Sequence, residues 1–258
     1  MKSKVKSVVF RLHSLIHGNV GSGLYLINGH YFDSQICGFS NADLISEIAN
    51  INSYGKLESW NFSDSHLMNY GLKPPKIKSF AFSFDDGFKE VSDLIVPAFD
   101  FFNIKVGIFI VPSFVGQNTS VASINFKLHS NKFREFMTWE DIKNLADRGH
   151  IIGNHTLSHS NLVLLSRREL EYEIQKSKEI IETNTNQLCD DFAIPYGRRE
   201  FYSDSVLKVI LKFHRRVFTS DRSRSYKQVG FESVYNRCHF EIGHSLESLQ
   251  YFTRYDLK

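Results

Sequence analysis

Two histidines separated by three residues, His155 and His159, have the spacing that points most directly to chemistry in this 258-residue chain. On a helical turn this spacing puts both imidazoles on one side, where they can bind one metal ion. A chain with 11 histidines also contains such pairs by chance, so the pair alone is weak evidence. It indicates a catalytic metal site only if a carboxylate joins it and a coordination position stays open.

An adjacent acidic pair, Asp85 and Asp86, is the candidate source of that carboxylate. It follows residues 78–84, an apolar run that predicts a buried strand. Neighbouring side chains on an extended segment point in opposite directions, so we expect one carboxylate to bind the metal and the other to act as a base. The alternative is that Asp-Asp-Gly forms only a turn, which is the commoner role of such a sequence.

Strands and helices alternate from residue 77 onward, which is typical of an α/β fold with parallel strands. The expected strands are 78–84, 105–113, 150–155, 191–197, 215–220 and 235–242. The expected helices begin near residue 88, at Thr138, at Ser166, at Ser203 and near residue 245. Thr138 and Ser166 are each followed three residues later by an acidic residue, which favours a helix start, and Pro97 predicts a bend in the first helix.

The candidate residues all follow the ends of expected strands. Asp85 and Asp86 end the first strand, His155 ends the third, and Pro195 and Tyr196 end the fourth. In a parallel α/β fold the carboxyl ends of the strands share one face, and active sites assemble there. We therefore expect these side chains to meet at one rim, although six strands are fewer than the eight of a regular barrel.

At these residues the sequence resembles the polysaccharide deacetylase family, carbohydrate esterase family four. Three ordered motifs with similar spacing carry the resemblance: 83–87 (SFDDG), 155–159 (HTLSH) and 192–197 (FAIPYG). The resemblance covers residues 78–220 well. It implies a distorted (β/α) barrel with fewer than eight parallel strands and an active site at their carboxyl ends.

The resemblance also implies roles for single residues. Asp85 is expected to be the general base, and Asp86, His155 and His159 are expected to bind a divalent metal. The backbone N–H of Tyr196 is expected to help hold the oxyanion. Zinc suits two imidazoles with one carboxylate, and cobalt, nickel or manganese would also bind such ligands.

The chain departs from the family pattern in two places. Ala193 stands where the family often has an arginine that steadies the base. The Leu-x-His motif that supplies the general acid in the family has no clean match near the C-terminus. His239 and His244 are candidates for that acid by location only, and His13 is a candidate for the mouth of the site.

Three residues are predicted to bind substrate, namely Pro195, Arg237 and His239. For Arg237 a contact with the base is the alternative, and an ordinary position at a strand end is a further one. For His239 the alternative is an ordinary strand histidine.

Composition limits both the organisation and the partners of the chain. It is 42% hydrophobic and 14% aromatic, which excludes a largely disordered protein. Its 31 basic and 28 acidic residues exclude a strongly basic nucleic-acid binder. The breaker at residues 73–76 separates an irregular N-terminal segment, 1–76, expected to pack on the barrel, from a deacetylase-like catalytic domain, 77–258.

A cytoplasmic location is expected from three observations. The three cysteines form no Cys-x-x-Cys pair. The basic and briefly apolar N-terminus has no small-residue cleavage site. No apolar run reaches the ~18 residues of a membrane span, so stable membrane insertion is not expected.

Together these observations predict a metal-dependent carbohydrate deacetylase, a hydrolase of non-peptide carbon–nitrogen bonds that removes an N-acetyl group from a sugar or polysaccharide precursor. A cytoplasmic location favours a nucleotide- or lipid-linked sugar. Two alternatives stay open: a glycan-binding protein of the same fold without a working acid, and a hydrolase of a small amide or an O-acetyl ester.

Overall fold

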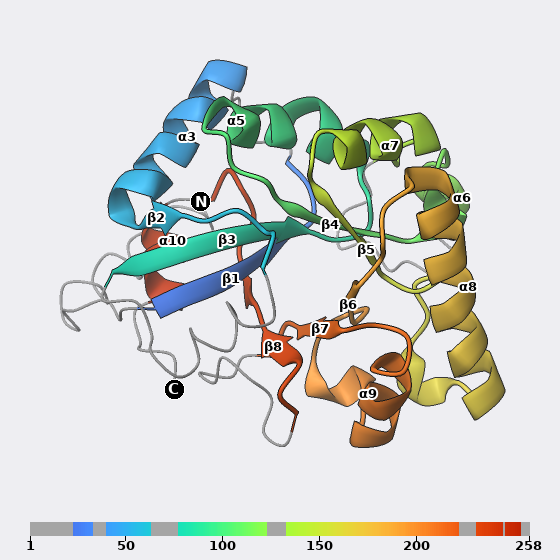
Figure 1. Cartoon of the computed structure of the whole chain (residues 1–258). Helices are drawn as coiled ribbons and strands as arrows, with labels where there is room; N and C mark the ends of the chain where they lie inside the picture. Colours follow the sequence, from blue (N-terminus) through green and yellow to red (C-terminus); the bar gives the residue numbers. More distant parts are fainter. Residues whose placement is uncertain are drawn as a thin grey trace.

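The structure, a computed structural model, describes residues 23–32, 40–62, 77–122, 133–221, 231–244 and 246–253. Its strands form one sheet that curves into a nearly closed barrel, and every pairing between the described strands is parallel (Figure 1). The strands are β1 (Gly23–Gly29), β2 (Lys56–Leu57), β3 (Lys78–Phe84), β4 (Gly107–Ile110), β5 (Ile151–Asn154), β6 (Asp191–Ala193), β7 (Arg216–Thr219), β8 (Val234–Asn236) and β9 (Cys238–His239). Their order is β8-β7-β6-β5-β4-β3-β1-β9, and β2 pairs with the start of β3.

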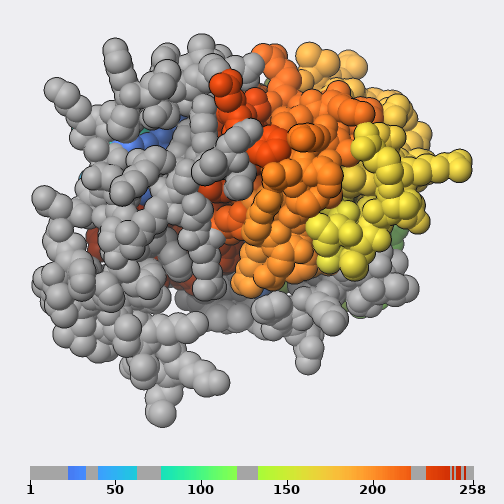
Figure 2. All heavy atoms as spheres, turned by 90° about the horizontal axis from the view of Figure 1, so that it is seen from below, coloured from blue at the N-terminus to red at the C-terminus, as the bar shows by residue number. Residues whose placement is uncertain are grey.

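Helices cover the outside of the barrel. They are α3 (Asn41–Tyr54), the π-helical η1 (Val91–Ile95), α5 (Val96–Phe101), α6 (Thr119–Ala122), α7 (Trp139–Asp147), α8 (Arg167–Thr185), α9 (Asp204–Ile210) and α10 (Leu246–Phe252), with short 3₁₀ turns η2 (Pro112–Phe114), η3 (Leu162–Leu164) and η4 (Arg199–Phe201). Figure 1 shows α3, α5, α7, α8 and α9 following one another around the barrel. Figure 2 shows one face of the molecule, on which the residues coloured yellow to orange lie side by side. These residues include α8 and α9, which contact each other.

Local signals in the sequence explain where these helices begin. The side-chain oxygens of Thr138 and Ser166 each accept a hydrogen bond from the backbone N–H three residues later. The acidic side chain at that later position accepts a hydrogen bond from the backbone N–H of Thr138 or Ser166 in return, so α7 and α8 begin as predicted. Pro97, where a bend was predicted, lies in the first turn of α5, directly after the π-helical η1. None of the described helices is long and apolar enough to cross a lipid bilayer.

The seam of the barrel lies at Arg237. β8 and β9 are two halves of one segment on either side of this residue; β8 pairs with β7, and β9 pairs with β1. The N–H of Arg237 donates to the carbonyl oxygen of Thr219 at 3.0 Å, and the N–H of Phe240 donates to that of Asn28 at 2.9 Å. This one segment therefore closes the barrel. The eight strands of this order form a nearly closed parallel barrel, which confirms the predicted distorted (β/α) barrel, although the wall has eight strands rather than the expected smaller number.

The N-terminal part of the chain belongs to the barrel wall. β1 lies between β3 and β9, and α3 and β2 follow it before the described chain reaches residue 62. The sequence predicted an irregular segment packed against the barrel, with a short helix at residues 41–51. The structure has that helix as α3, whereas β1 is part of the barrel wall itself. Residues 5–10, whose apolar and β-branched residues would also suit a strand, lie outside the described residues.

Alternation along the strands separates the outside of the barrel from its interior. Even-numbered residues of β1 and odd-numbered residues of β3 point inward, because Leu24, Leu26 and Ala81 share a core cluster with Trp60 and other inner residues. Their neighbours in sequence pack instead against the outer helices in a second cluster. Continued beyond the strand ends, this alternation directs the side chains of residues 30 and 85 into the mouth of the barrel.

The buried His214 contacts Asn154, the last residue of β5. The side-chain amide of Asn154 donates to the carbonyl oxygen of Ile174 at 3.0 Å and lies 3.1 Å from Nε2 of His214. Its side-chain oxygen accepts from the N–H of Thr156 at 2.8 Å. Nε2 of His214 must be unprotonated to accept from this amide. Burial, with a contribution from Lys178, lowers the pKa of His214 to about 3.

We predict that His214 makes the fold sensitive to acid. An unfolded histidine takes up a proton near its ordinary pKa of about 6.5, whereas the folded one resists until about pH 3. Stability is therefore lost as the pH falls from 6.5 toward 3. His214→Gln keeps an acceptor that does not titrate, so its free energy of unfolding should fall less steeply, by up to about 1.4 kcal/mol per pH unit.

Urea unfolding at several pH values measures this difference. The matched control is His244→Gln, which removes an exposed histidine and should keep the wild-type slope. Identical slopes for wild type and His214→Gln would contradict the prediction.

Candidate metal centre and active site

The carboxyl ends of the strands bring the predicted ligands together. Asp86 follows β3, while His155 and His159 follow β5. Oδ1 of Asp86 lies 3.4 Å from Nε2 of His155 and 3.4 Å from Nε2 of His159. One ligand atom from each of the three residues lies within 4.8 Å of the others. All three side chains are buried, so a cation held between them would be largely shielded from solvent.

One atom of this cluster lacks the partner that its burial requires. Oδ1 of Asp86 is buried and makes no hydrogen bond to any described residue. A buried polar atom without a partner destabilises a fold by about 1–3 kcal/mol, and more when it is charged. Two imidazole nitrogens and a carboxylate oxygen are the ligands of many catalytic zinc sites, so a divalent cation fits this arrangement.

The protonation states also suit a cation. Burial by itself would raise the pKa of Asp86, but the neighbouring imidazoles His155, His159 and His30 lower it to about 2. Burial lowers the pKa of His159 to about 4, against the attraction of Asp86. At neutral pH the cluster therefore offers a carboxylate and a neutral imidazole, which are the forms that bind metal.

Left-handed backbone conformations, rather than a helix, bring the two histidines together. The sequence predicted a helical turn, but the described residues 155–161 form none. Thr156 has φ 66° and His159 has φ 59°, and Asp86 in the other loop has φ 71°. Such conformations are uncommon for residues with a side chain and gather at functional sites. His155 is fixed by Nδ1, which donates to the carbonyl oxygen of Ala193 at 2.8 Å and leaves Nε2 toward Asp86.

Asp85 forms a bidentate ion pair with Arg237 at the seam of the barrel. Nη1 and Nη2 of Arg237 each donate to one carboxylate oxygen of Asp85 at 2.7 Å. Nη1 also donates to Oγ of Ser83 at 3.0 Å, and Nε donates to the carbonyl oxygen of Thr219 at 3.3 Å. Burial alone would raise the pKa of Asp85, but the Arg237 guanidinium, together with His155 and His30, outweighs burial, and the net shift is downward.

The placement of Arg237 corrects its predicted contact with substrate. Its side chain is buried and its terminal nitrogens are used by Asp85 and Ser83. It contacts the predicted base, which the sequence left open as the alternative. Ala193, where the resemblance leads one to expect an arginine, supplies only its carbonyl oxygen to His155. The guanidinium next to Asp85 thus comes from the opposite end of the sequence.

A second pair, His30 and Glu241, was not predicted from the sequence. Nδ1 of His30 lies 2.8 Å from Oε1 of Glu241, and the backbone N–H of His30 donates to Oε2 at 2.8 Å. Strand register places this pair beside Asp85: Gly29 is paired with Phe84, and Asn28 with His239. His30 therefore comes level with Asp85 on one side and with Glu241 on the other. A histidine directly after an apolar strand was the signal that could have found it.

The remaining predicted residues lie at different depths. Pro195 is buried and so offers little surface to a substrate. Tyr196 is 42% exposed and has φ 64°. The centroid of its ring lies 4.7 Å from the centroid of the His159 ring. His239 is exposed beside Glu241, and His244 is also exposed. His13 lies outside the described residues.

Gly197 permits the turn that carries Tyr196. It has φ 67°, and a Cβ atom there would lie 2.5 Å from Cβ of Ser220 and 2.8 Å from its backbone nitrogen. A side chain at position 197 would therefore collide with the loop after β7 and displace Tyr196.

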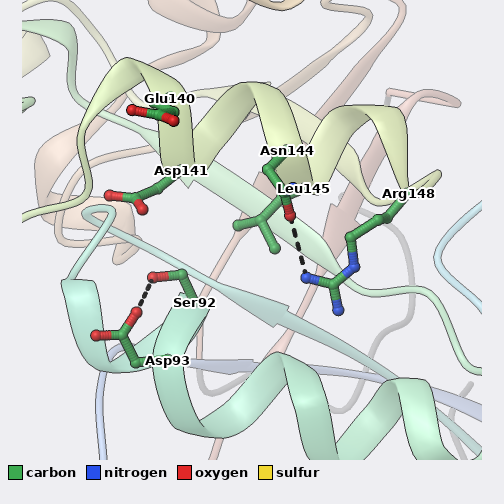
Figure 3. Close-up of a pocket in the computed structure, with 7 residues that line it drawn as sticks. All are labelled: Ser92, Asp93, Glu140, Asp141, Asn144, Leu145 and Arg148. Carbon is green, nitrogen blue, oxygen red and sulfur yellow. Dashed lines mark hydrogen bonds between the residues drawn. The ribbon is translucent and has the colours of Figure 1, made fainter.

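A separate surface hollow lies between η1 and α7 (Figure 3). Its volume is about 290 Å³, and it is lined by Ser92, Asp93, Glu140, Asp141, Asn144, Leu145 and Arg148. Lys89 bridges two of these carboxylates, Asp93 at 3.3 Å and Asp141 at 2.6 Å. None of the lining residues belongs to the groups at the strand ends.

The sequence is similar to known deacetylases over part of its length. It is 24% identical over 149 residues to YxkH of Bacillus subtilis, a putative polysaccharide deacetylase, which covers 58% of this chain and 47% of the relative. It is 33% identical over 78 residues to the peptidoglycan-N-acetylglucosamine deacetylase of Bacillus cereus, which covers 28% of each chain. The matched stretches thus span half or less of these two relatives.

Solved structures share the fold over nearly the whole chain. IcaB of Ammonifex degensii has a TM-score of 0.66 at 18% identity, covering 92% of this chain and 99% of that chain. The deacetylase PplD of Streptococcus pyogenes, in complex with acetate, has a TM-score of 0.63 at 15% identity, covering 92% and 98%. The sequence model of the polysaccharide deacetylase family matches residues 72–218, more than half of the 258. The chain therefore belongs to the polysaccharide deacetylase family.

Proposed function

We propose that the chain is a metal-dependent hydrolase that removes the N-acetyl group from an amino sugar of a glycan or a glycan precursor. The observation that carries this proposal is the pair of adjacent carboxylates at the mouth of the barrel. Asp85 is held by Arg237, and Asp86 faces two imidazoles. A cytoplasmic location, with a nucleotide- or lipid-linked sugar as substrate, is part of the proposal on the basis of the sequence.

Asp86, His155 and His159 would hold the metal. A divalent cation supplies positive charge that polarises the acetamide carbonyl and favours deprotonation of water. The donor set suits zinc. The buried position of the three ligands gives this charge a low-dielectric setting, where it acts more strongly than in water.

Asp85 is placed to act as the general base. Its lowered pKa keeps it deprotonated at neutral pH, and Arg237 fixes the direction of its carboxylate. A base removes the proton of the attacking water as the tetrahedral oxyanion forms. The backbone N–H of Tyr196 is proposed as a donor to that oxyanion, on the basis of the family motif. One such donor is worth about 2.7–4 kcal/mol in comparable sites.

His30 is placed to act as the general acid. Burial lowers its pKa, but the charge of Glu241, with smaller contributions from Asp86 and Asp85, outweighs burial and raises the pKa to about 10. His30 is therefore an imidazolium at neutral pH and holds the proton that the leaving amine requires. The absent Leu-x-His motif was the reason for considering a binding protein without catalysis, and the His30–Glu241 pair offers another source for the proton.

Within the proposed mechanism, the first prediction concerns the base, Asp85. Asp85→Asn should lower acetate release from N-acetylated sugars by about 10²–10⁴-fold, while the metal content stays at the wild-type level. Acetate release and metal analysis are measured on the same protein, with the metal present, chelated and restored.

Asp147→Asn, an exposed change at the end of α7, is the matched control and should be fully active. Undiminished activity after complete chelation, or an Asp85→Asn enzyme that turns over normally, would refute the proposed function. The same assay with O-acetylated sugars distinguishes an amidase from an esterase.

A second prediction concerns Arg237. Without its positive charge the pKa of Asp85 rises, so the acid limb of the pH profile of kcat/KM should move to higher pH in Arg237→Gln. Removing one partner of a buried ion pair also destabilises a fold by about 3–5 kcal/mol, and thermal unfolding monitors this effect. Arg237→Lys keeps the charge and should move the limb less. An acid limb that does not move in Arg237→Gln would contradict the prediction.

A third prediction concerns the acid. His30→Gln should lower the rate on N-acetyl sugars by about 10²–10⁴-fold and should lower hydrolysis of 4-nitrophenyl acetate much less, because nitrophenolate leaves without a proton. Glu241→Gln removes the charge that raises the pKa of His30, so the alkaline limb should move to lower pH. Equal losses on both substrates would show that His30 only supports the structure. His244→Gln serves as the control.

A further inference from the structure

A second cluster of metal-binding groups lies next to the proposed active site. It consists of His30 after β1, His239 at the end of β9, and Glu241 two residues later. One ligand atom from each of the three lies within 4.8 Å of the others. The cluster shares no residue with the Asp86, His155 and His159 group, and it is built on different strands.

The geometry of this cluster directs one carboxylate oxygen at both imidazoles. Oε2 of Glu241 accepts from the backbone N–H of His30 at 2.8 Å and from that of Tyr31 at 3.4 Å. These contacts turn Oε1 toward Nδ1 of His30 at 2.8 Å and toward Nε2 of His239 at 3.5 Å. The ring centroids of the two histidines lie 5.2 Å apart. Outer hydrogen bonds that fix a ligating carboxylate in this way are typical of metal sites.

The distances are close to those that a cation needs. Zinc binds nitrogen and oxygen at about 2.0–2.2 Å, so two ligand atoms on one tetrahedral ion are roughly 3.3 Å apart. The two contacts of Oε1 lie on either side of this value, so shifts of roughly half an ångström would admit an ion. The side chains of His239, His30 and Glu241 are 51%, 30% and 15% exposed, which gives an ion and its water ligands access from solvent.

We propose that His30, His239 and Glu241 form a second divalent-cation site, which takes zinc in place of the proton between His30 and Glu241. Binding releases that proton to solvent and forms bonds from zinc to Nδ1 of His30, to Nε2 of His239 and to Oε1 of Glu241. The remaining positions of the ion are filled by water. The site is weaker than the buried one, because it is more exposed and because the ion competes with a proton.

Occupancy of this site inhibits the enzyme, a consequence that rests on the proposed function. A protonated His30 can give up a proton and become a neutral imidazole. With zinc on Nδ1 the ring has no such proton, because losing the one on Nε2 would produce an imidazolate. Excess zinc therefore removes the general acid while the three ligands of the catalytic metal are untouched.

The test counts zinc on the full chain without a histidine tag. Equilibrium dialysis against graded zinc chloride, followed by metal analysis, should give two equivalents on the wild type, one bound more tightly than the other. His239→Gln should keep the tight equivalent and lose the weak one. Asp86→Asn should lose the tight one and keep the weak one. His244→Gln, a nearby exposed histidine outside the cluster, should keep both.

Activity supplies the second measurement. Acetate release by the wild type should fall at least tenfold as zinc rises from one equivalent to saturation of the weak site, and His239→Gln, compared with its own rate at one equivalent, should not fall. One equivalent on the wild type at saturating zinc, two on His239→Gln, or inhibition unchanged in that variant would overturn the proposal. A wild type that binds the second ion through His239 but releases no acetate supports the second site and refutes the proposed function instead.

Discussion

Two adjacent carboxylates buried at the mouth of a barrel are the constraint on which the rest of the site depends. Each needs a polar or charged partner within a few ångströms, because an ionised carboxylate without one is too costly to bury. The two find such a partner in different ways. Asp85 receives both prongs of Arg237, whereas Asp86 faces two imidazoles with one oxygen still lacking a hydrogen bond among the described residues. This difference suits Asp85 to the proposed role of base and Asp86 to the proposed cation site.

The closure of the barrel and the position of the base are consequences of one residue's placement. Arg237 lies where the last strand segment leaves β7 and joins β1, so the seam that closes the wall also delivers the guanidinium to Asp85. An arginine at position 193 would come from β6 instead. Since the contact depends on where the nitrogens lie, strands far apart in the sequence can supply the same charge. In this chain the charge beside Asp85 therefore comes from the seam of the barrel and not from β6.

The sequence predicted the elements more reliably than the contacts. The bounds of β3 and the capped starts of α7 and α8 are local properties, since they depend on alternation and on hydrogen bonds three residues apart. Spacing also pointed to His155 and His159, but a helical turn was the wrong geometry, because Thr156 and His159 have left-handed conformations that the local sequence does not predict. Arg237 and His30 depend on strand register and on closure of the barrel, which no local pattern contains.

Register also explains how the proposed acid and the proposed base come to lie so close together. Three neighbouring strands, β9, β1 and β3, end level with one another, so Glu241, His30 and Asp85 form a row. Glu241 stabilises a proton on His30, while Arg237 disfavours one on Asp85. The two groups are thus held in opposite protonation states by different partners, as an acid and a base acting on one amide must be. A carboxylate that stabilises a proton so strongly also attracts any other small cation, and the exposed imidazole of His239 beside it makes zinc the natural competitor.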